Sequence, residues 1–400
     1  MLSLDQIYHA SYVLRDVARK TDMIEAAALS SMAGCRLFLK TENLQLTGSF
    51  KLRGAYYRIS KLTDEQKKAG ILACSAGNHA QGVALAASRA GLRSVICMPD
   101  GAPISKVEAT KAFGAEVVLV KGGYDDAYAH ACRLREETGM TFIHPFNDED
   151  VIAGQGTIGL EILDQLPDAD AVLVPVGGGG LLSGVVYAIK SLNPKVQVWG
   201  VQAEHAASMQ RSLQAGTPMT LDRAQTFADG IAVRRPGDLT YDICSRYADG
   251  ILTVTEDEIA AAILALLEKQ KMISEGAGAV GLAAVLAKKL DLRGKKVCCL
   301  ISGGNIDVNI LSRVIARGLI TTGRRVTLQV ALEDKPGQLV DVSRIVAECG
   351  ANVISVVHNM GNAGTAVTSC TLTLGLETRD AAQIAEIRAR LAEAGFALVE

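Results

Sequence analysis

From about residue 69 onward, short runs rich in valine, isoleucine and leucine alternate with stretches of helical composition. Such alternation is typical of parallel sheets whose strands are connected by helices. One series of these units runs from about 69 to 146, and a second runs from about 154 to 301 with a polar interruption at about 205 to 250. A length of 400 residues leaves room for two or three folded units. We therefore expect an α/β architecture with two lobes.

The hydrophobic pattern changes after Gly323. It predicts a strand at 326–333, an amphipathic helix at 337–350, strands at 352–360 and 366–376, a helix at 379–395 and a strand at 396–400. This β-α-β-β-α-β order over some 75 residues suffices for a ferredoxin-like α+β domain. We place the boundary at 321–325 and expect a domain at 1–320 and another at 326–400.

Charge and cysteine content exclude several classes of protein. The net charge is −2 and the basic residues are scattered, which disfavours a nucleic-acid partner. No apolar run reaches the length of a membrane span, and charges interrupt the N-terminus where a signal peptide would be apolar. The nine cysteines follow no CxxC pattern and fit reduced, packed thiols. We expect a cytoplasmic protein that does not bind a membrane.

Glycines are concentrated at the ends of predicted strands. The chain has 39 of them, about 11 more than an average composition gives. Gly177, Gly178, Gly179 and Gly180 lie between a predicted buried strand and a helix, where backbone N–H groups and the helix dipole favour an anion such as a phosphate. The spacing fits neither a P-loop nor a dinucleotide-binding motif. The alternative is a tight turn without a ligand, although four consecutive glycines cost backbone entropy that a simple turn avoids.

Two other strand ends carry polar residues. Ser302 stands beside two glycines in 301–307, and 75–82 holds Ser75, Asn78 and His79 at a predicted helix start. Because open α/β sheets bind ligands at the carboxyl ends of their strands, these loops could line one cavity. Taken singly, Ser75 or Asn78 is explained equally well as a helix cap, and His79 alone is better explained as structural.

Lys51 is the remaining candidate functional residue. It follows Phe50 among small residues, which gives a lysine the reach and low crowding that a Schiff base to an aldehyde cofactor needs. Surface lysines are commoner than catalytic ones, so Lys51 alone does not indicate catalysis. A catalytic role is favoured only because Lys51 occurs together with the three loops.

Four motifs in this order resemble those of the pyridoxal-phosphate enzymes with the tryptophan-synthase β-type fold (fold type II), and among these the threonine ammonia-lyases. The motifs are ENLQLTGSFKLRGA, SAGNHAQGVALAA, VGGGGLLSG and SGGN, and the resemblance covers about residues 5 to 320. It implies a catalytic domain whose smaller lobe, about 50–145, is inserted in the larger one. The segments EDKPGQL and GANVISV are similar to those of ACT domains, which are regulatory modules that bind amino acids.

The resemblance also implies roles for individual residues. Lys51 carries the cofactor and Phe50 faces its ring; Gly177 to Gly180 and the Leu181 amide hold its phosphate. Asn78 meets the ring hydroxyl, and Ser302 meets the pyridine nitrogen. Ser75, Ala76, Asn78 and His79 bind the substrate carboxylate, and Lys51 and Ser75 are the catalytic residues.

The implied reaction is β-elimination, which converts L-threonine to 2-oxobutyrate and ammonia, with L-serine as a side substrate. A serine dehydratase and a serine racemase of the same fold are the alternatives. Similar racemases carry a second serine where this chain has Ala76, so racemisation should be weak. A catalytically inactive amino-acid sensor is disfavoured by the intact Lys51.

Some relatives bind a cation through a glutamate and an aspartate. Glu204 matches the first, but Gln210 stands in place of the second, so we expect no metal there. For the C-terminal segment we expect an amino-acid effector near Pro336, Gly337, Leu339 and Asn352, at an interface between paired domains. A domain that only oligomerises is the alternative. The whole protein is expected to be a homo-oligomer, either a dimer or a tetramer.

Overall fold

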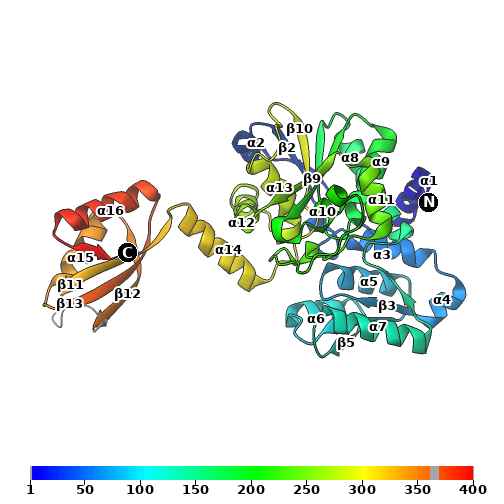
Figure 1. The fold of residues 1–400 in the computed structure, drawn as a ribbon, viewed down its shortest axis with the longest axis horizontal. Coiled ribbons are helices and arrows are strands. Elements are labelled where there is room, and N and C mark those ends of the chain that lie inside the picture. Colours follow the sequence, from blue (N-terminus) through cyan, green and yellow to red (C-terminus); the bar gives the residue numbers. More distant parts are fainter. Residues whose placement is uncertain (1, 361–368, 400) are drawn as a thin grey trace. The chain divides into compact units, whose positions relative to one another are not determined.

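A computed structural model describes residues 2–360 and 369–399 of the chain. The chain divides into two compact units, residues 1–307 and residues 308–400, drawn in blue to yellow and in yellow to red in Figure 1. Within the described ranges, no helix is long and apolar enough to cross a membrane.

The first unit is built on a six-stranded sheet with the order β1-β2-β10-β7-β8-β9. Only the β1–β2 pair is antiparallel, and the other neighbours run parallel. The strands are β1 (Met23–Glu25), β2 (Arg36–Lys40), β7 (Ala171–Pro175), β8 (Gln197–Ala203), β9 (Gly250–Val254) and β10 (Lys296–Leu300).

Helices cover both faces of this sheet, as parallel strands require. One face packs on α1 (Leu4–Leu14), α8 (Glu149–Gln165), α9 (Gly180–Leu192), α10 (Ser208–Ala215) and α11 (Asp238–Tyr247), with which it shares a single hydrophobic core. On the other face, α2 (Ala27–Ala33) and α13 (Gly276–Leu286) contact the strands, and α12 (Glu256–Ala265) packs on α13.

A second, four-stranded parallel sheet is built from one contiguous stretch of chain, in the order β5-β4-β3-β6. Two cores cover its two faces: one includes residues of α3, α5 and α6, and the other includes residues of α7. The elements are α3 (Lys51–Ser60), α4 (Asp64–Ala69), β3 (Ile71–Cys74), α5 (Asn78–Arg89), β4 (Ser94–Pro99), α6 (Ile104–Ala112), β5 (Glu116–Val120), α7 (Tyr124–Thr138) and β6 (Thr141–Phe142).

Both sheets reverse their strand order at one point. In the smaller sheet the chain goes from β3 to β4 and β5, and then returns to place β6 on the other side of β3. In the larger sheet it goes from β7 to β8 and β9, and then returns to place β10 on the other side of β7. A crevice opens at the carboxyl ends of the strands at such a point. The residues that follow β3, β6, β7 and β10 therefore face two crevices.

The second unit begins with α14 (Val308–Thr321) and continues as β11 (Arg325–Glu333), α15 (Gln338–Glu348), β12 (Asn352–Met360), β13 (Ser369–Glu377), α16 (Ala381–Glu393) and β14 (Ala397–Val399). The four strands form an antiparallel sheet in the order β12-β13-β11-β14. Buried side chains of β11 and β13 pack on α15 and α16 in one core. Element order and strand order are those of a ferredoxin-like fold.

Where the expected elements can be compared, their type is right and some limits differ. The first series of units was expected to run to about 146, but its last strand ends at Phe142, because Pro145 has no N–H to donate and the His144 ring accepts hydrogen bonds from the backbone of Phe146 and Asn147. The second series was expected to begin at about 154, but its first helix begins at Glu149, since Asp148 caps it. Residues 366–368 and 400 of two expected strands lie outside the described residues. The limits of the elements before residue 69 and within 205–250 were not predicted.

Candidate active site

A cavity of about 790 Å³ lies in the first unit and is lined by the segments that follow β3, β6, β7 and β10. All the cofactor-binding and substrate-binding residues expected in this unit line it: Phe50, Lys51, Ser75, Ala76, Asn78, His79, Gly177, Gly178, Gly179, Gly180, Leu181 and Ser302. The two reversal points of the sheets thus bring together segments as far apart in sequence as residues 51 and 302.

Lys51 is the first residue of α3, and its Nζ donates a hydrogen bond to the carbonyl of Pro145 at 2.8 Å. The same Nζ lies 5.3 Å from the centroid of the Phe50 ring. Burial lowers the pKa of Lys51 to about 8, although the charge of Glu275 opposes the shift. Near neutral pH a larger share of this amine is unprotonated than of an ordinary lysine, which favours attack on a carbonyl carbon.

The four glycines connect β7 to the 13-residue helix α9. Gly179 has φ +97°, a conformation that favours glycine. A Cβ on Gly178 would lie 2.4 Å from the Phe146 ring, and one on Gly180 would lie 2.8 Å from the Cβ of Phe146. No side chain fits at these positions, so backbone amides at the start of a helix line the cavity. These residues fit a phosphate group.

The loop after β3 leads into α5. Gly77 donates its backbone N–H to Ser75 Oγ at 3.1 Å. Asn78 Nδ2 donates to Glu275 Oε1 at 2.7 Å, and Asn78 Oδ1 accepts from Asn305 Nδ2 at 2.8 Å. The amide of Asn78 is thereby held in one orientation at the edge of the cavity.

His79 lines the cavity, but its ring already makes a hydrogen bond within the fold. Nε2 lies 2.9 Å from the carbonyl of Ile143, which can only accept, so this nitrogen donates. Burial and the charge of Lys51 lower the pKa of His79 to about 3, so the ring is neutral at pH 7. A contribution of His79 to anion binding would therefore come from its backbone N–H.

Ser302 is held next to the lysine segment by the backbone. Phe50 donates its N–H to the Ser302 carbonyl at 3.2 Å, and Ser49 pairs with Gly303 in an isolated bridge. The cavity therefore presents a hydroxyl rather than a carboxylate at this position, beside the residue that precedes Lys51.

Glu275 is a cavity residue that the sequence reasoning missed. It precedes α13 and is 4% exposed. Burial and the charge of Asp229 raise its pKa to about 7, while the hydrogen bond from Asn78 lowers it. The sequence feature that could have indicated Glu275 is a charged residue directly before an apolar helix, in the segment MISEGAGAVGL. Asn305, which orients Asn78, stood within the SGGN motif but was not singled out.

Gln210, which stands where some relatives have a cation-binding aspartate, makes hydrogen bonds within the fold. The backbone N–H of Gln210 donates to Gln202 Oε1, and its side-chain Nε2 donates to the carbonyl of Ile251, each at 2.9 Å. Gln210 is thus occupied by contacts within the fold.

A buried lysine, a glycine cradle for a phosphate and a neutral hydroxyl, placed between two α/β lobes, define the class of pyridoxal-phosphate enzymes. The chain belongs to the family described as pyridoxal-phosphate dependent enzyme, whose model matches residues 14–303. Within it, the chain is 50% identical over 396 residues to an L-threonine ammonia-lyase of Thermotoga maritima, covering 99% of this chain and 98% of that one.

Two further similar proteins are named threonine dehydratase and threonine deaminase. The catabolic L-threonine dehydratase of Escherichia coli is 46% identical over 315 residues, which cover 78% of this chain and 96% of the relative. The solved structure of a processed threonine deaminase from Solanum lycopersicum superposes with a TM-score of 0.76 at 40% identity, covering 78% of this chain and 92% of that one.

Proposed function

We propose that this protein is an L-threonine ammonia-lyase, which converts L-threonine to 2-oxobutyrate and ammonia and accepts L-serine as a side substrate. The observation that carries the proposal is the amine of Lys51, which lies in the same cavity as the Gly177–Gly180 cradle. The relative that shares 50% identity along nearly the whole chain has this activity in its name.

The cavity residues can be assigned to parts of the cofactor. Gly177 to Gly180 and the Leu181 amide would hold the phosphate at the start of α9. Lys51 would bind the aldehyde carbon, and Phe50 would contact the ring. Asn78, oriented by Glu275 and Asn305, would bind the ring hydroxyl. Ser302 would bind the ring nitrogen.

Pyridoxal phosphate, when bound, withdraws electrons from the α-carbon of an attached amino acid. Lys51 removes the α-proton, and the amine can accept it because its pKa is lowered to about 8. Ser75 and the amides of Ala76, Asn78 and His79 hold the substrate carboxylate at the start of α5.

The hydroxyl of Ser302 carries no charge, so it does not hold a proton on the ring nitrogen as a carboxylate would. This would favour loss of the β-hydroxyl directly after removal of the α-proton. Threonine loses a proton from Cα and a hydroxide from Cβ as water. The product then takes up water and releases ammonia, which leaves 2-oxobutyrate.

The test is formation of 2-oxobutyrate by the purified holoenzyme. We expect a higher kcat/KM for threonine than for serine, and no turnover in Lys51→Ala, which also loses the visible absorption of bound cofactor. A higher kcat/KM for serine would make the protein a serine dehydratase. Rapid formation of D-serine would make it a racemase despite Ala76, and an inactive wild-type holoenzyme would favour an amino-acid sensor.

We further propose that the C-terminal unit is an ACT domain that binds an amino-acid effector between two copies of the chain. Gly337 follows β11, whereas Asn352 begins β12. Both strands pair with β13, and the register puts Asn352 beside Glu377 and the end of β11 beside Ser369. Gly337, with Pro336 and Leu339, is thus at the opposite end of the sheet from Asn352, about 25 Å away. A site that uses all four residues requires a second copy.

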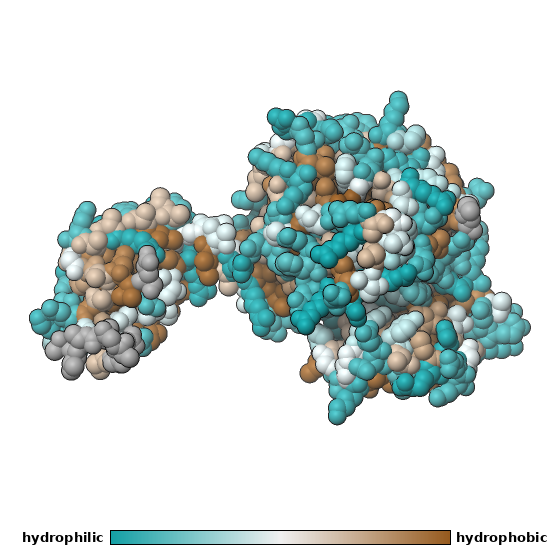
Figure 2. Space-filling view, in the orientation of Figure 1, coloured by the Kyte–Doolittle hydropathy of each residue, from teal (hydrophilic) through white to brown (hydrophobic). Residues whose placement is uncertain are grey.

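Exposed apolar residues on the edge strand β12 support this pairing. Figure 2 shows hydrophobic surface, in brown, on the C-terminal unit. Val356, Val357 and Met360 are 45%, 48% and 70% exposed. An apolar edge strand open to solvent is an association surface. We propose a cytoplasmic homo-oligomer, and the nine free cysteines agree with a reducing compartment.

A further inference from the structure

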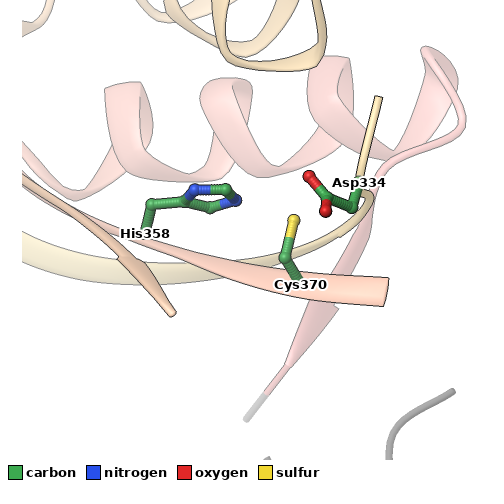
Figure 3. Close-up of side chains that lie close together, drawn as sticks. All are labelled: Asp334, His358 and Cys370. Atoms are coloured by element: carbon green, nitrogen blue, oxygen red, sulfur yellow. The ribbon is translucent and has the colours of Figure 1, made fainter. Parts of the chain in front are cut away.

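We propose that Asp334, His358 and Cys370 form a binding site for a zinc-like divalent transition-metal ion in the C-terminal unit. Asp334 follows β11, His358 lies on β12 and Cys370 lies on β13. Their carboxylate, imidazole and thiol donor atoms all lie within 4.8 Å of one another. Figure 3 shows the three side chains close together. The site is distinct from the cavity that contains Lys51, which lies in the first unit.

The strand register brings these three residues close together. Cys370 pairs with Leu332 of β11 on one side and with Met360 of β12 on the other. Paired residues point to the same face of a sheet, and so do residues two apart along a strand. His358 is two residues before Met360, and Asp334 is two residues after Leu332. Both flank Cys370 on the face that it occupies.

The donor set selects the kind of metal. A thiolate with an imidazole suits zinc and related transition metals, whereas magnesium and calcium prefer oxygen ligands alone. Three protein ligands leave one tetrahedral position for water. In such a site the donors are about 3.3 to 3.7 Å apart, so any pair of donors that lies further apart, up to the 4.8 Å limit, must come closer. Asp334 and His358 are exposed and can rotate, while Cys370 is buried and fixes the position.

Binding replaces the thiol proton of Cys370 by the metal and releases that proton to water. No oxidant or reductant is needed. The bound ion would join the end of β11 to two other strands, and it would fix the segment that starts at Asp334 and continues to Gly337.

The experiment titrates Co²⁺ into the untagged, full-length holoenzyme and follows absorption. A thiolate-to-cobalt band, with ligand-field bands of a four-coordinate site at longer wavelengths than the cofactor absorbs, should saturate at one ion per chain. Added Zn²⁺ should abolish these bands, because it displaces cobalt.

Cys370→Ser should lose the thiolate band, and Asp334→Asn and His358→Gln should each weaken affinity at least about tenfold. Cys349→Ser is the matched control, since Cys349 is a buried cysteine of the same unit, and it should titrate like the wild type. Circular dichroism and urea unfolding of each variant report that the C-terminal unit is folded, because turnover, whose cavity lies within residues 1–307, would not reveal its loss. A wild type without cobalt bands, or bands that survive Cys370→Ser, would overturn the proposal.

Discussion

At the scale of single residues, the cavity contains ionisable groups whose burial opposes their charge. The pKa of Lys51 is lowered to about 8 and that of Glu275 is raised to about 7, in both cases mainly by burial. Each shift favours the neutral form and therefore costs the folded protein free energy whenever the group is charged. Buried ionisable groups with shifted pKa values are common in active sites.

Glu275→Gln should stabilise the apoenzyme at pH 8 but not at pH 4.5 or below. The folded protein keeps the Glu275 proton up to about pH 7, while the unfolded chain loses it near pH 4.5. The cost of ionisation therefore grows between these values and is complete above pH 7, where it is on the order of 3 kcal/mol. Glutamine removes it and still accepts the hydrogen bond from Asn78.

Urea unfolding of the apoenzyme at several pH values measures this effect. Glu136→Gln, at an exposed position of α7, is the control and should show no such trend. A stability difference between Glu275→Gln and the wild type that does not change from pH 5 to pH 8 would contradict the assigned pKa.

At the scale of elements, the start of α3 is anchored by a buried ionic network. Arg53 donates to Glu42 Oε1 and Oε2 at 2.7 and 2.9 Å and to Glu161 Oε1 at 2.6 Å, and Lys40 donates to Glu161 Oε2 at 2.5 Å. Arg53 is two residues after Lys51, so the network holds the first turn of the helix against β2 and α8.

Arg53→Met should destabilise the protein by about 3 to 5 kcal/mol, because it leaves Glu42 buried without its charged partner. Displacement of the first turn of α3 should also weaken cofactor binding. Urea unfolding and cofactor titration measure the two effects. Arg89→Met serves as control, since Arg89 is exposed and its side chain donates to the backbone carbonyls of Asp16 and Val17. A loss no greater than that of the control would show that the network contributes little.

Gly178→Ala should weaken binding of pyridoxal phosphate to the apoenzyme. The added methyl group would lie 2.4 Å from the Phe146 ring and would displace the segment whose Pro145 carbonyl accepts the Lys51 hydrogen bond. Overpacking of about 1 to 3 kcal/mol corresponds to a loss of affinity of roughly 5-fold to 150-fold.

Titration of the apoenzyme with the cofactor, followed by absorption, measures that affinity. Gly101→Ala is the matched control, because a Cβ at Gly101 would meet nothing within 4 Å. Equal affinities of the two variants would count against a cradle that only glycine can form.

Sequence patterns could predict the elements that carry the site, because the period of an α/β unit and a glycine cluster at a strand end are local signals. They could not predict Glu275 as a cavity residue, since its partner Asn78 is 197 positions away in sequence. The network of Lys40, Arg53 and Glu161 was missed for the same reason, because its bonds join residues more than 100 positions apart in sequence. The Asp334, His358 and Cys370 cluster requires the strand register, which no spacing along the chain reveals.

At the scale of the whole molecule, catalysis and the proposed regulation belong to different units. The cavity and its hydrogen bonds lie within residues 1–307. The Escherichia coli dehydratase has 96% of its length within a match that covers only 78% of this chain, so a relative of that name has a shorter chain.

Truncation after Gly323 should leave 2-oxobutyrate formation at the same order of magnitude and abolish any response to an effector. The assay is turnover with and without isoleucine, valine or serine, for the truncated and the full-length protein. An effector response that survives truncation would place the effector site in the first unit. A full-length protein with no response would favour a C-terminal unit that only oligomerises.

The position of β10 has a consequence for how the chain is made. It is the last strand of the larger sheet to be translated, at residues 296–300, yet it lies between β2 and β7, which are translated long before it. The smaller sheet, by contrast, comes from one uninterrupted segment that ends at Phe142. On the ribosome the smaller lobe can fold as soon as it emerges, while β2, which ends at residue 40, must wait with an unpaired edge until β10 is completed at residue 300. Nascent chains arrested before and after β10 should therefore differ sharply in the protease resistance of the larger lobe.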